Sequence, residues 1–296
     1  MSPADAVGES RDGVVLRVSG PTAAVWVDGE EQEARIVPQL AGGPPVAGDR
    51  VELRVHEGDE PAVVAIRPRT TMLQRGDGTD RRPRVLFANA DLLLVVASAT
   101  TPPLHPRLID RYLVAGELGG LGSAIIVTKA DLPHDEAELA EILDRYRGVG
   151  YPTLLGSAKS PELLEETRAL IGGRVAALVG HSGVGKSTLT SGLTGVPRAT
   201  GAVSAKKGTG RHTTSDPRLI PLPGGGGVVD TAGVRTFHLP AMDRADLEAG
   251  FPEIAAAAAG CRFRGCAHDG DAGCAVAGAV SAERLDSYRR MLHGLP

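Results

Sequence analysis

Cysteine is scarce in this chain of 296 residues, and its three cysteines all lie between residues 261 and 274. An odd number of clustered cysteines does not suit a disulfide framework and indicates metal binding in a reducing compartment. Long apolar runs are also missing, since the longest, Leu92–Ala97, has the length of a strand, whereas a membrane span needs roughly 20 residues. The N-terminus has no basic n-region and no apolar segment, so the sequence predicts no secretory signal and a cytoplasmic protein.

The charge is uneven along the chain, although the net charge is only −4. Residues 1–60 hold twelve acidic and five basic side chains. Residues 67–84 hold six arginines and two aspartates, and residues 198–218 hold five basic side chains and one aspartate. Clustered Arg and Lys displace counterions from a nucleic-acid backbone, so both basic segments are candidate phosphate-contacting surfaces, with solvated loops as the alternative.

The first part of the chain has the pattern of a small all-β domain. Arg50–Val55 alternates strictly between polar and apolar residues, and turn signals rich in Gly, Pro and Asp separate the β-prone runs. Five such strands in about 60 residues predict an OB-type barrel over residues 11–72, with an SH3-like barrel as the alternative. The predicted strands are Val14–Val18, Ala23–Val27, Ala34–Val37, Arg50–Val55 and Ala62–Ile66.

The pattern changes after an Arg-rich loop at residues 75–84. Continuous apolar runs at Asp91–Val96 and Ser123–Val127 are typical of strands buried in a parallel sheet, and helical periodicity follows each run. Alternating strands and helices predict an α/β domain, which we assign to residues 84–240. The expected helices are Pro106–Leu118 and Asp135–Arg147, and a further strand is expected at Tyr151–Leu155.

A glycine-rich segment, Gly180-His-Ser-Gly-Val-Gly-Lys-Ser187, follows an apolar run and precedes a helix-permissive stretch. This is the layout of a nucleoside-triphosphate phosphate loop. Its glycines let backbone amides turn toward a β-phosphate, Lys186 reaches the β- and γ-phosphate oxygens, and Ser187 supplies a hydroxyl to Mg²⁺. The predicted phosphate-binding residues are Gly180, His181, Ser182, Gly183, Val184, Gly185, Lys186, Ser187 and Thr188.

The residues that select the base lie upstream of the phosphate loop. Thr128-Lys-Ala-Asp131 directly follows one predicted strand, and Ser157-Ala-Lys159 follows the next. A carboxylate at Asp131 accepts hydrogens from N1 and the exocyclic amine of guanine, and adenine does not offer this pair. A buried carboxylate left unpaired strongly disfavours the wrong base. The predicted guanine-binding residues are Thr128, Lys129, Ala130, Asp131, Ser157, Ala158 and Lys159.

Individual residues of these two loops have different predicted roles. The aliphatic stem of Lys129 covers the base, and the backbone amides of Ser157 and Ala158 face its carbonyl oxygen. The first position of such a motif is commonly Asn, whose amide ties the loop to the phosphate loop. Thr128 can make only part of that contact, so we expect weaker nucleotide affinity with unchanged base choice.

Two segments downstream complete a nucleotide hydrolysis site. Asp230-Thr-Ala-Gly233 ends a predicted strand, where Asp230 would hold Mg²⁺ through water and the Gly233 amide would contact the γ-phosphate. Residues 210–215 lie in a polar, basic loop with the position of a first switch, which can close on Mg²⁺ through Thr213 or Thr214.

Hydrolysis also needs a group that orients the attacking water. Val234 stands where Ras-like enzymes carry a glutamine for this purpose, and valine cannot do it. We therefore expect slow intrinsic hydrolysis, with His212 or a group from a binding partner positioning the water, and contact of His212 with RNA as the alternative. The predicted catalytic residues are Lys186, His212, Thr213, Thr214, Asp230 and Gly233.

The cysteine cluster predicts a metal site. Cys261, Cys266, His268 and Cys274 place three thiols and an imidazole within fourteen residues. These are the ligands of a closed tetrahedral zinc site, which leaves no position for water. One structural Zn²⁺ would then stabilise a mainly helical domain over residues 241–296, which is too small to depend on its core alone.

The base-reading loops precede the phosphate loop and both switches, which is a circular permutation of the usual GTPase order. With this order of motifs, the chain resembles the RsgA (YjeQ) family of circularly permuted GTPases. The resemblance implies a GTP hydrolase of late small-ribosomal-subunit assembly or maturation, stimulated by that particle, with the subunit and its ribosomal RNA as partners. We expect a monomer without membrane or DNA partners. The resemblance rests on Ala88–Asp91, Ile109–Leu113, Thr128–Asp131, Gly180–Thr188, Gly210–Thr214, Asp230–Gly233 and the cysteine cluster.

Two alternatives from other classes are kept. One is a P-loop ATPase or kinase, which would not need Thr128-Lys-Ala-Asp131, and the other is a zinc-and-OB RNA-binding module with a weakly hydrolysing regulatory nucleotide site. The permuted order also suggests that γ-phosphate contacts of the second switch, near Gly233, reorient the C-terminal domain that begins soon after it.

Overall fold

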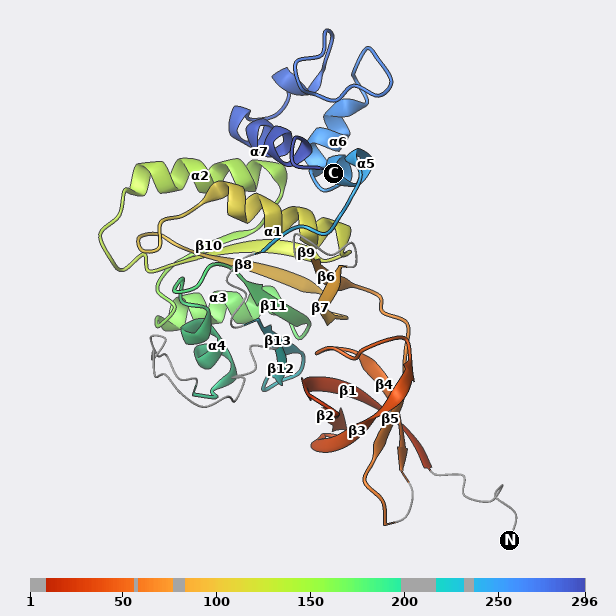
Figure 1. Cartoon of the computed structure of the whole chain (residues 1–296). Helices are drawn as coiled ribbons and strands as arrows, with labels where there is room; N and C mark the ends of the chain where they lie inside the picture. Colours follow the sequence, from red (N-terminus) through yellow and green to blue (C-terminus); the bar gives the residue numbers. More distant parts are fainter. Residues whose placement is uncertain (1–8, 56–57, 77–82, 198–216, 232–236, 296) are drawn as a thin grey trace, which may run out of the picture.

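The computed structural model describes residues 9–55, 58–76, 83–197, 217–231 and 237–295. A closed β-barrel at the N-terminus is followed by a sheet with helices on both faces and then by a helical C-terminal region (Figure 1). This architecture confirms the fold class predicted from the sequence.

The N-terminal barrel closes in the strand order β1-β2-β3-β5-β4. Its interior is apolar, and Val15, Val25, Leu53 and Val63 are each at most 2% exposed. Because β1 also pairs with β4, no strand of the barrel has an open edge. A closed barrel of five strands is the architecture that the alternation pattern predicted. The strands are β1 (Glu9–Ser19), β2 (Thr22–Val27), β3 (Glu30–Ala41), β4 (Arg50–Val55) and β5 (Ala62–Ile66).

A pair of strands that the sequence analysis did not predict flanks the predicted Arg-rich loop at residues 75–84. β6 (Met72–Arg75) and β7 (Arg84–Ala88) run antiparallel, with Leu73 opposite Phe87. Both of these side chains are 0% exposed and belong to the main apolar core. Burial of these two side chains in the core thus stabilises a strand pair that the sequence analysis did not predict.

The central sheet has six strands in the order β10-β9-β8-β11-β13-β12. Five strands are parallel, and β12 runs antiparallel to β13 at one edge. All seven residues of β8 are buried, as a continuous apolar run predicts for a strand covered on both faces. β12 was not predicted, because four residues ending in proline give little periodicity. The strands are β8 (Leu92–Ser98), β9 (Gly122–Thr128), β10 (Thr153–Leu155), β11 (Val175–Val179), β12 (Arg218–Pro221) and β13 (Gly227–Asp230).

Four helices cover this sheet (Figure 1): α1 (Pro106–Leu118) and α2 (Glu136–Val149) on one face, α3 (Pro161–Ile171) and α4 (Lys186–Thr194) on the other.

The bounds of α1 are those predicted, whereas α2 is shifted toward its C-terminus. Asp135 caps α2 by accepting a hydrogen bond from the Glu138 amide at 2.9 Å, so it precedes the helix. The helix continues to Val149, and Gly150, with a φ of 104°, ends it. Among the described residues, no helix has the length and apolar character required to cross a bilayer.

The C-terminal region packs its short helices against α1 (Figure 1). Its apolar core includes Leu247, Phe251 and Tyr288, each 0% exposed, together with Val114 from α1. The helices are α5 (Arg244–Ala249), α6 (Pro252–Ala258), the single 3-10 turn η1 (Val276–Gly278) and α7 (Ala282–Leu292).

A buried charge cluster joins α1 to these helices. Asp110 on α1 is 2% exposed and Arg284 on α7 is 1% exposed, with Arg284 Nη1 2.7 Å from Asp110 Oδ1. Arg284 Nε lies 2.6 Å from Glu253 Oε1 on α6, and the guanidinium lies 4.5 Å from the ring centroid of Phe251. Asp110 also accepts a hydrogen bond from the Tyr146 hydroxyl at 2.9 Å. Removing Arg284 would leave the buried Asp110 carboxylate without its cation, whereas removing Asp110 would leave Arg284 paired with Glu253 alone.

Replacing Asp110 by alanine is expected to lower the free energy of unfolding by about 1.5–3 kcal/mol, because Arg284 then loses one of its two carboxylate partners and keeps only Glu253. Urea unfolding followed by circular dichroism measures the loss. The matched control is Asp286→Ala, which removes a surface carboxylate, 45% exposed, from its pairs with Arg107 and Arg290. This control should cost less than about 1 kcal/mol, and equal losses in the two variants would contradict the assignment.

Candidate functional site

The loops that carry the predicted site residues leave the central sheet at one edge. β9, β10, β11 and β13 are parallel, so the segments after their carboxyl ends lie on the same side of the sheet. The chain passes outward through β8, β9 and β10 and then returns to β11, beside β8. Ligands of such sheets bind beyond the carboxyl ends of the strands where the strand order reverses, which here is between β8 and β11.

The phosphate loop connects β11 to α4 and depends on its glycines. Gly180, Gly183 and Gly185 have φ angles of 142°, 84° and 98°, in the region that favours glycine. A Cβ atom on Gly180 would lie 2.1 Å from the carbonyl oxygen of Val96 on β8, so no side chain fits there. α4 begins at Lys186, directly after this turn, and its first amides are available to an anion.

The ammonium of Lys186 is held within the turn of the phosphate loop. Its Nζ donates to the carbonyl oxygens of Gly180 and His181, both at 2.7 Å. Burial lowers the pKa of Lys186 to about 8, because the ammonium has lost part of its hydration. A polyphosphate at this loop would supply the negative charge that favours the ammonium form.

Loops from three strands meet at Gly185. The Thr128 hydroxyl, at the end of β9, bonds to the carbonyl oxygen of Val184 in the phosphate loop and lies 3.1 Å from that of Ala97. A Cβ atom on Gly185 would lie 3.2 Å from Thr128 Oγ1 and 3.7 Å from the Cβ of Ala158, which follows β10. The threonine hydroxyl therefore makes a direct bond between the base-reading loop and the phosphate loop.

The other residues of the base-reading loops lie beside this contact. The Ala130 amide donates to the carbonyl oxygen of Gly156 at 3.2 Å, which joins the loop after β9 to the loop after β10. Lys129 has a φ of 61°, and its ammonium donates to the carbonyl oxygen of Thr101. Asp131 is exposed and so accessible to a ligand. The remaining predicted loop residues are half-buried or exposed: Ser157, Lys159, His181, Ser182, Ser187 and Thr188.

Asp230, the predicted Mg²⁺ residue, ends β13 and is 1% exposed. It is in register with Leu178 on β11, so it lies one strand away from the strand that leads into the phosphate loop. The next residue, Thr231, donates to the carbonyl oxygen of Leu178 at 2.6 Å and fixes the chain there. A carboxylate here and the Ser187 hydroxyl at the start of α4 are hard oxygen ligands of the kind that Mg²⁺ requires. The other predicted residues of the switches lie outside the described residues: His212, Thr213, Thr214 and Gly233.

The four predicted zinc ligands meet in the C-terminal region. One ligand atom from each of Cys261, Cys266, His268 and Cys274 lies within 4.8 Å of all the others. His268 Nδ1 is 3.6 Å from Cys261 Sγ and 3.5 Å from Cys274 Sγ. Tetrahedral bonds of about 2.3 Å to sulfur and about 2.1 Å to nitrogen would place a sulfur and a nitrogen ligand about 3.6 Å apart. The cluster therefore has the donors and the spacing to hold Zn²⁺.

Glu248 orients the imidazole of this cluster, and the sequence reasoning missed it. Its Oε2 lies 3.1 Å from His268 Nε2, and His268 is 1% exposed. A carboxylate on the outer ring nitrogen fixes the tautomer and directs Nδ1 toward the thiols. Glu248 lies on α5, outside the cysteine spacing, so the sequence carries no local signal for this role.

Among the described arginines of the basic segment 67–84, Arg67 and Arg69 form ion pairs with barrel residues. Arg69 Nε lies 2.7 Å from Asp49 Oδ1, and Asp49 is 0% exposed. Arg67 lies 2.9 Å from Asp12 and 3.5 Å from Glu52. Arg69 therefore has a structural role in the barrel, and phosphate contact by this basic segment stays a prediction.

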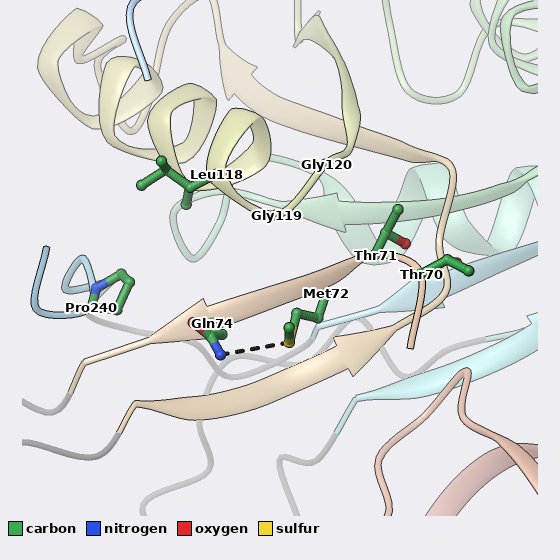
Figure 2. A pocket seen from close by; sticks show the side chains of 9 residues that line it. Thr70, Thr71, Met72, Gln74, Leu118, Gly119, Gly120 and Pro240 are labelled. Atoms are coloured by element: carbon green, nitrogen blue, oxygen red, sulfur yellow. Dashed lines mark hydrogen bonds between the residues drawn. The ribbon is translucent and has the colours of Figure 1, made fainter. Parts of the chain in front are cut away.

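A hollow of about 260 Å³ lies where β6, the end of α1 and Pro240 meet (Figure 2). Figure 2 shows Gln74 and Met72 directed at each other, with Gln74 Nε2 3.5 Å from Met72 Sδ. Its lining residues include no acidic, basic or thiol side chain and none of the predicted site residues. The hollow thus lacks the charge to bind a phosphate and the groups for acid–base chemistry.

Comparison with known proteins agrees with this arrangement. A family model described as RsgA GTPase matches residues 66–240. A curated relative from Azotobacter vinelandii, named small ribosomal subunit biogenesis GTPase RsgA, is 41% identical over 259 residues, which cover 85% of this chain and 75% of the relative. A relative of the same name from Chlorobaculum parvum is 37% identical over 310 residues, covering 98% of this chain and 99% of the relative.

Two solved structures share the fold over nearly the whole chain. YjeQ from Thermotoga maritima matches with a TM-score of 0.75 and 25% identity, covering 97% of this chain and 99% of that one. YloQ, described as a circularly permuted GTPase, matches with a TM-score of 0.74 and 24% identity, covering 99% of this chain and 98% of that one.

Replacing Glu248 by glutamine is expected to weaken Zn²⁺ affinity by about 10- to 100-fold, because the neutral amide holds the imidazole less strongly. Competition with a chromophoric chelator measures this affinity. The control is Glu283→Gln at the start of α7, where the carboxylate pairs with Arg145 at 3.4 Å, and it should leave the affinity unchanged. Wild-type zinc affinity in Glu248→Gln would show that this carboxylate does not support the site.

Proposed function

The chain belongs to the RsgA GTPase family, and from this premise we propose that it hydrolyses GTP during late assembly or maturation of the small ribosomal subunit. Its partners would be that subunit and its ribosomal RNA, in the cytoplasm, and the particle would stimulate the reaction. Family membership favours the hydrolase over the P-loop kinase and over an RNA-binding module that does not depend on nucleotide.

The observation that carries the proposal is the meeting of three loops at Gly185. Thr128 and Ala158 follow different strands from the phosphate loop, yet both lie within van der Waals range of a Cβ placed on Gly185. Residues for base and for phosphate recognition are thus close enough to bind one nucleotide. A phosphate loop without adjacent base-reading loops would support a general nucleotide site only.

Guanine recognition would depend on Asp131. Its carboxylate would accept hydrogens from N1 and the exocyclic amine, and the stem of Lys129 would cover the ring. The backbone amides of Ser157 and Ala158 would face the carbonyl oxygen of the base. The bond from Ala130 to Gly156 supports this role because it keeps the two loops together.

The phosphates would be held by the amides of the phosphate loop and by Lys186, whose position within the loop supports this role. Ser187, Asp230 and either Thr213 or Thr214 would hold Mg²⁺, and the Gly233 amide would contact the γ-phosphate. Mg²⁺, when bound, neutralises charge on the phosphate oxygens. The protein then orders the switches and positions water, for which His212 or a group of the ribosomal particle is proposed.

The three regions would divide this work. We propose an OB-type domain at residues 11–72, the permuted GTPase domain at residues 84–240 and a zinc domain at residues 241–296. One Zn²⁺ on Cys261, Cys266, His268 and Cys274 would stabilise the last of these without taking part in the reaction, since four protein ligands leave no open position. The outer two domains are the candidates for RNA contact.

Single-turnover measurement of phosphate release tests the proposed function. GTP hydrolysis by the full chain should be slow alone, because Val234 cannot orient water, and faster with purified small ribosomal subunits. His212→Ala should lower the stimulated rate by about 10²-fold or more, as expected for loss of a positioned catalytic side chain. Lys186→Ala serves as the control for contaminating nucleotidases.

The outcomes separate the parts of the proposal. A stimulated rate that is unchanged in His212→Ala would remove this residue from the reaction. Hydrolysis that does not respond to small subunits, or ATP hydrolysis as fast as GTP hydrolysis, would contradict the proposed function itself.

A further inference from the structure

The chain exposes one aromatic ring to solvent. Its four Phe, four Tyr and one Trp all lie in the described part of the chain, and among them Phe263, at 54% exposure, is the exposed one. Seven of the others are at most 6% exposed and belong to the apolar cores. Trp26 is half-buried and packs against the main core. Phe263 therefore stands apart as an aromatic side chain that stabilises no core.

Phe263 lies in the turn between the first two cysteines of the cysteine cluster. The Cys266 amide donates to the carbonyl oxygen of Phe263 at 3.3 Å. Arg244 on α5 donates from Nη1 to the carbonyl oxygen of Gly265 at 2.8 Å. The backbone of the turn is thus fixed by the region around it. A ligand of the ring would have to order little of the chain on binding.

Two arginines flank this ring. The guanidinium carbon of Arg262 lies 5.3 Å from the centroid of the Phe263 ring, within the range of a cation–π contact. Arg264 follows the ring and is exposed, as is Arg262. No carboxylate of the described residues forms an ion pair with either arginine. Both positive charges are thus available to an anionic ligand.

A hollow of about 950 Å³ lies between this turn and α5. Asp243 caps α5 with its carboxylate, and the carboxylate of Glu248 faces His268 at 3.1 Å, so both acidic groups of the hollow are engaged by the fold. The three arginines therefore supply the charge that the hollow offers to a ligand. Apart from the predicted zinc ligands, its charged lining consists of Arg244, Arg262, Arg264, Asp243 and Glu248.

The position of the turn and the composition of the barrel both bear on the ligand. The loops that follow α6 lie on the side of the C-terminal region that faces away from the central sheet (Figure 1). A large partner can therefore reach them. OB-type barrels bind single strands by stacking bases on aromatic side chains. Trp26 is the one aromatic residue of the barrel and is packed against the main core, so the barrel offers no exposed ring for this purpose.

We propose that the turn Arg262-Phe-Arg264 binds an unpaired nucleotide of single-stranded RNA, with the base stacked on Phe263 and the neighbouring phosphates held by the two arginines. The inference rests on the proposed action on the small ribosomal subunit, which makes the strand RNA. It assigns the stacking contact to the C-terminal region and not to the barrel. Every base has an aromatic face, so this contact predicts little sequence preference. Bases within a duplex are stacked on one another and do not reach the ring.

Fluorescence anisotropy of a labelled uridine 12-mer, titrated with the full chain loaded with Zn²⁺, tests the stacking contact. Phe263→Leu keeps an apolar side chain and removes the ring, so it should raise the Kd by about 5- to 150-fold, the range for one lost stacking contact. Phe263→Tyr keeps the ring and should bind as the wild type does. The matched control is Leu118→Ala, which shortens another exposed apolar side chain, on α1, and should leave the Kd unchanged.

The salt dependence of the same Kd tests the arginines. Arg264→Gln should weaken binding and reduce the slope of log Kd against log salt concentration by about 0.7, the value for one lost phosphate contact on a single strand. Arg147→Gln on α2, which removes an arginine paired with Asp144 at 2.8 Å, should leave the slope unchanged. A merely structural role of the turn would change zinc affinity or unfolding without changing this slope.

The remaining outcomes overturn defined parts. Equal Kd values for Phe263→Leu and the wild type, or tighter wild-type binding of a 12-base-pair RNA duplex than of the single strand, would overturn the stacking contact. Weaker pelleting of Phe263→Leu with small subunits, with uridine binding unchanged, would assign the ring to a protein partner and overturn the inference. A wild-type chain that binds the 12-mer but does not pellet with small subunits would instead contradict the proposed function.

Discussion

The bond between Thr128 and the phosphate loop holds the candidate nucleotide site together, because chain connectivity does not. Thr128 and Val184 are separated by 56 positions, and they meet because β9 and β11 flank β8 in a parallel sheet. Ala158, from the next strand outward, completes the contact at Gly185. The candidate site therefore depends on which strands are neighbours in the sheet. A circular permutation changes the order of the segments along the chain but leaves these neighbours the same.

Two sets of contacts connect this sheet region to the N-terminal barrel and to the C-terminal region. Asn89 accepts a hydrogen bond from the Thr70 amide at 2.9 Å and donates to the carbonyl oxygen of Gly48 in the barrel at 3.0 Å. At the other end, Arg284 is buried against Asp110 on α1. The segments Ala88–Asp91 and Ile109–Leu113, which contain no predicted nucleotide ligand, thus have structural roles at the two regional boundaries.

Short motifs identify the candidate site residues directly, whereas periodicity missed strands at the edges of the fold. The phosphate loop and the cysteine cluster are short segments whose chemistry is complete within their own spacing. Glu248 acts on His268 from another element, and a single glutamate on a short helix looks like any solvated side chain. β12 pairs with β13, the β6–β7 pair buries Leu73 and Phe87 in the main core, and Arg69 pairs with the buried Asp49. A short stretch of sequence around each of these residues does not contain its partner, so the contact cannot be predicted from that stretch.

The central claim is that Asp131 reads guanine beside a phosphate loop encoded about fifty positions later. Competition of GTP, ATP and xanthosine triphosphate against a fluorescent guanine nucleotide, on the wild type and on Asp131→Asn, tests it most directly. The account predicts that the wild type prefers GTP over ATP by a factor on the order of 10⁴. It also predicts that Asp131→Asn prefers xanthosine triphosphate over GTP, because the asparagine amide donates to the C2 carbonyl of xanthine. Equal binding of ATP and GTP by the wild type, or an unchanged preference for GTP in Asp131→Asn, would contradict it.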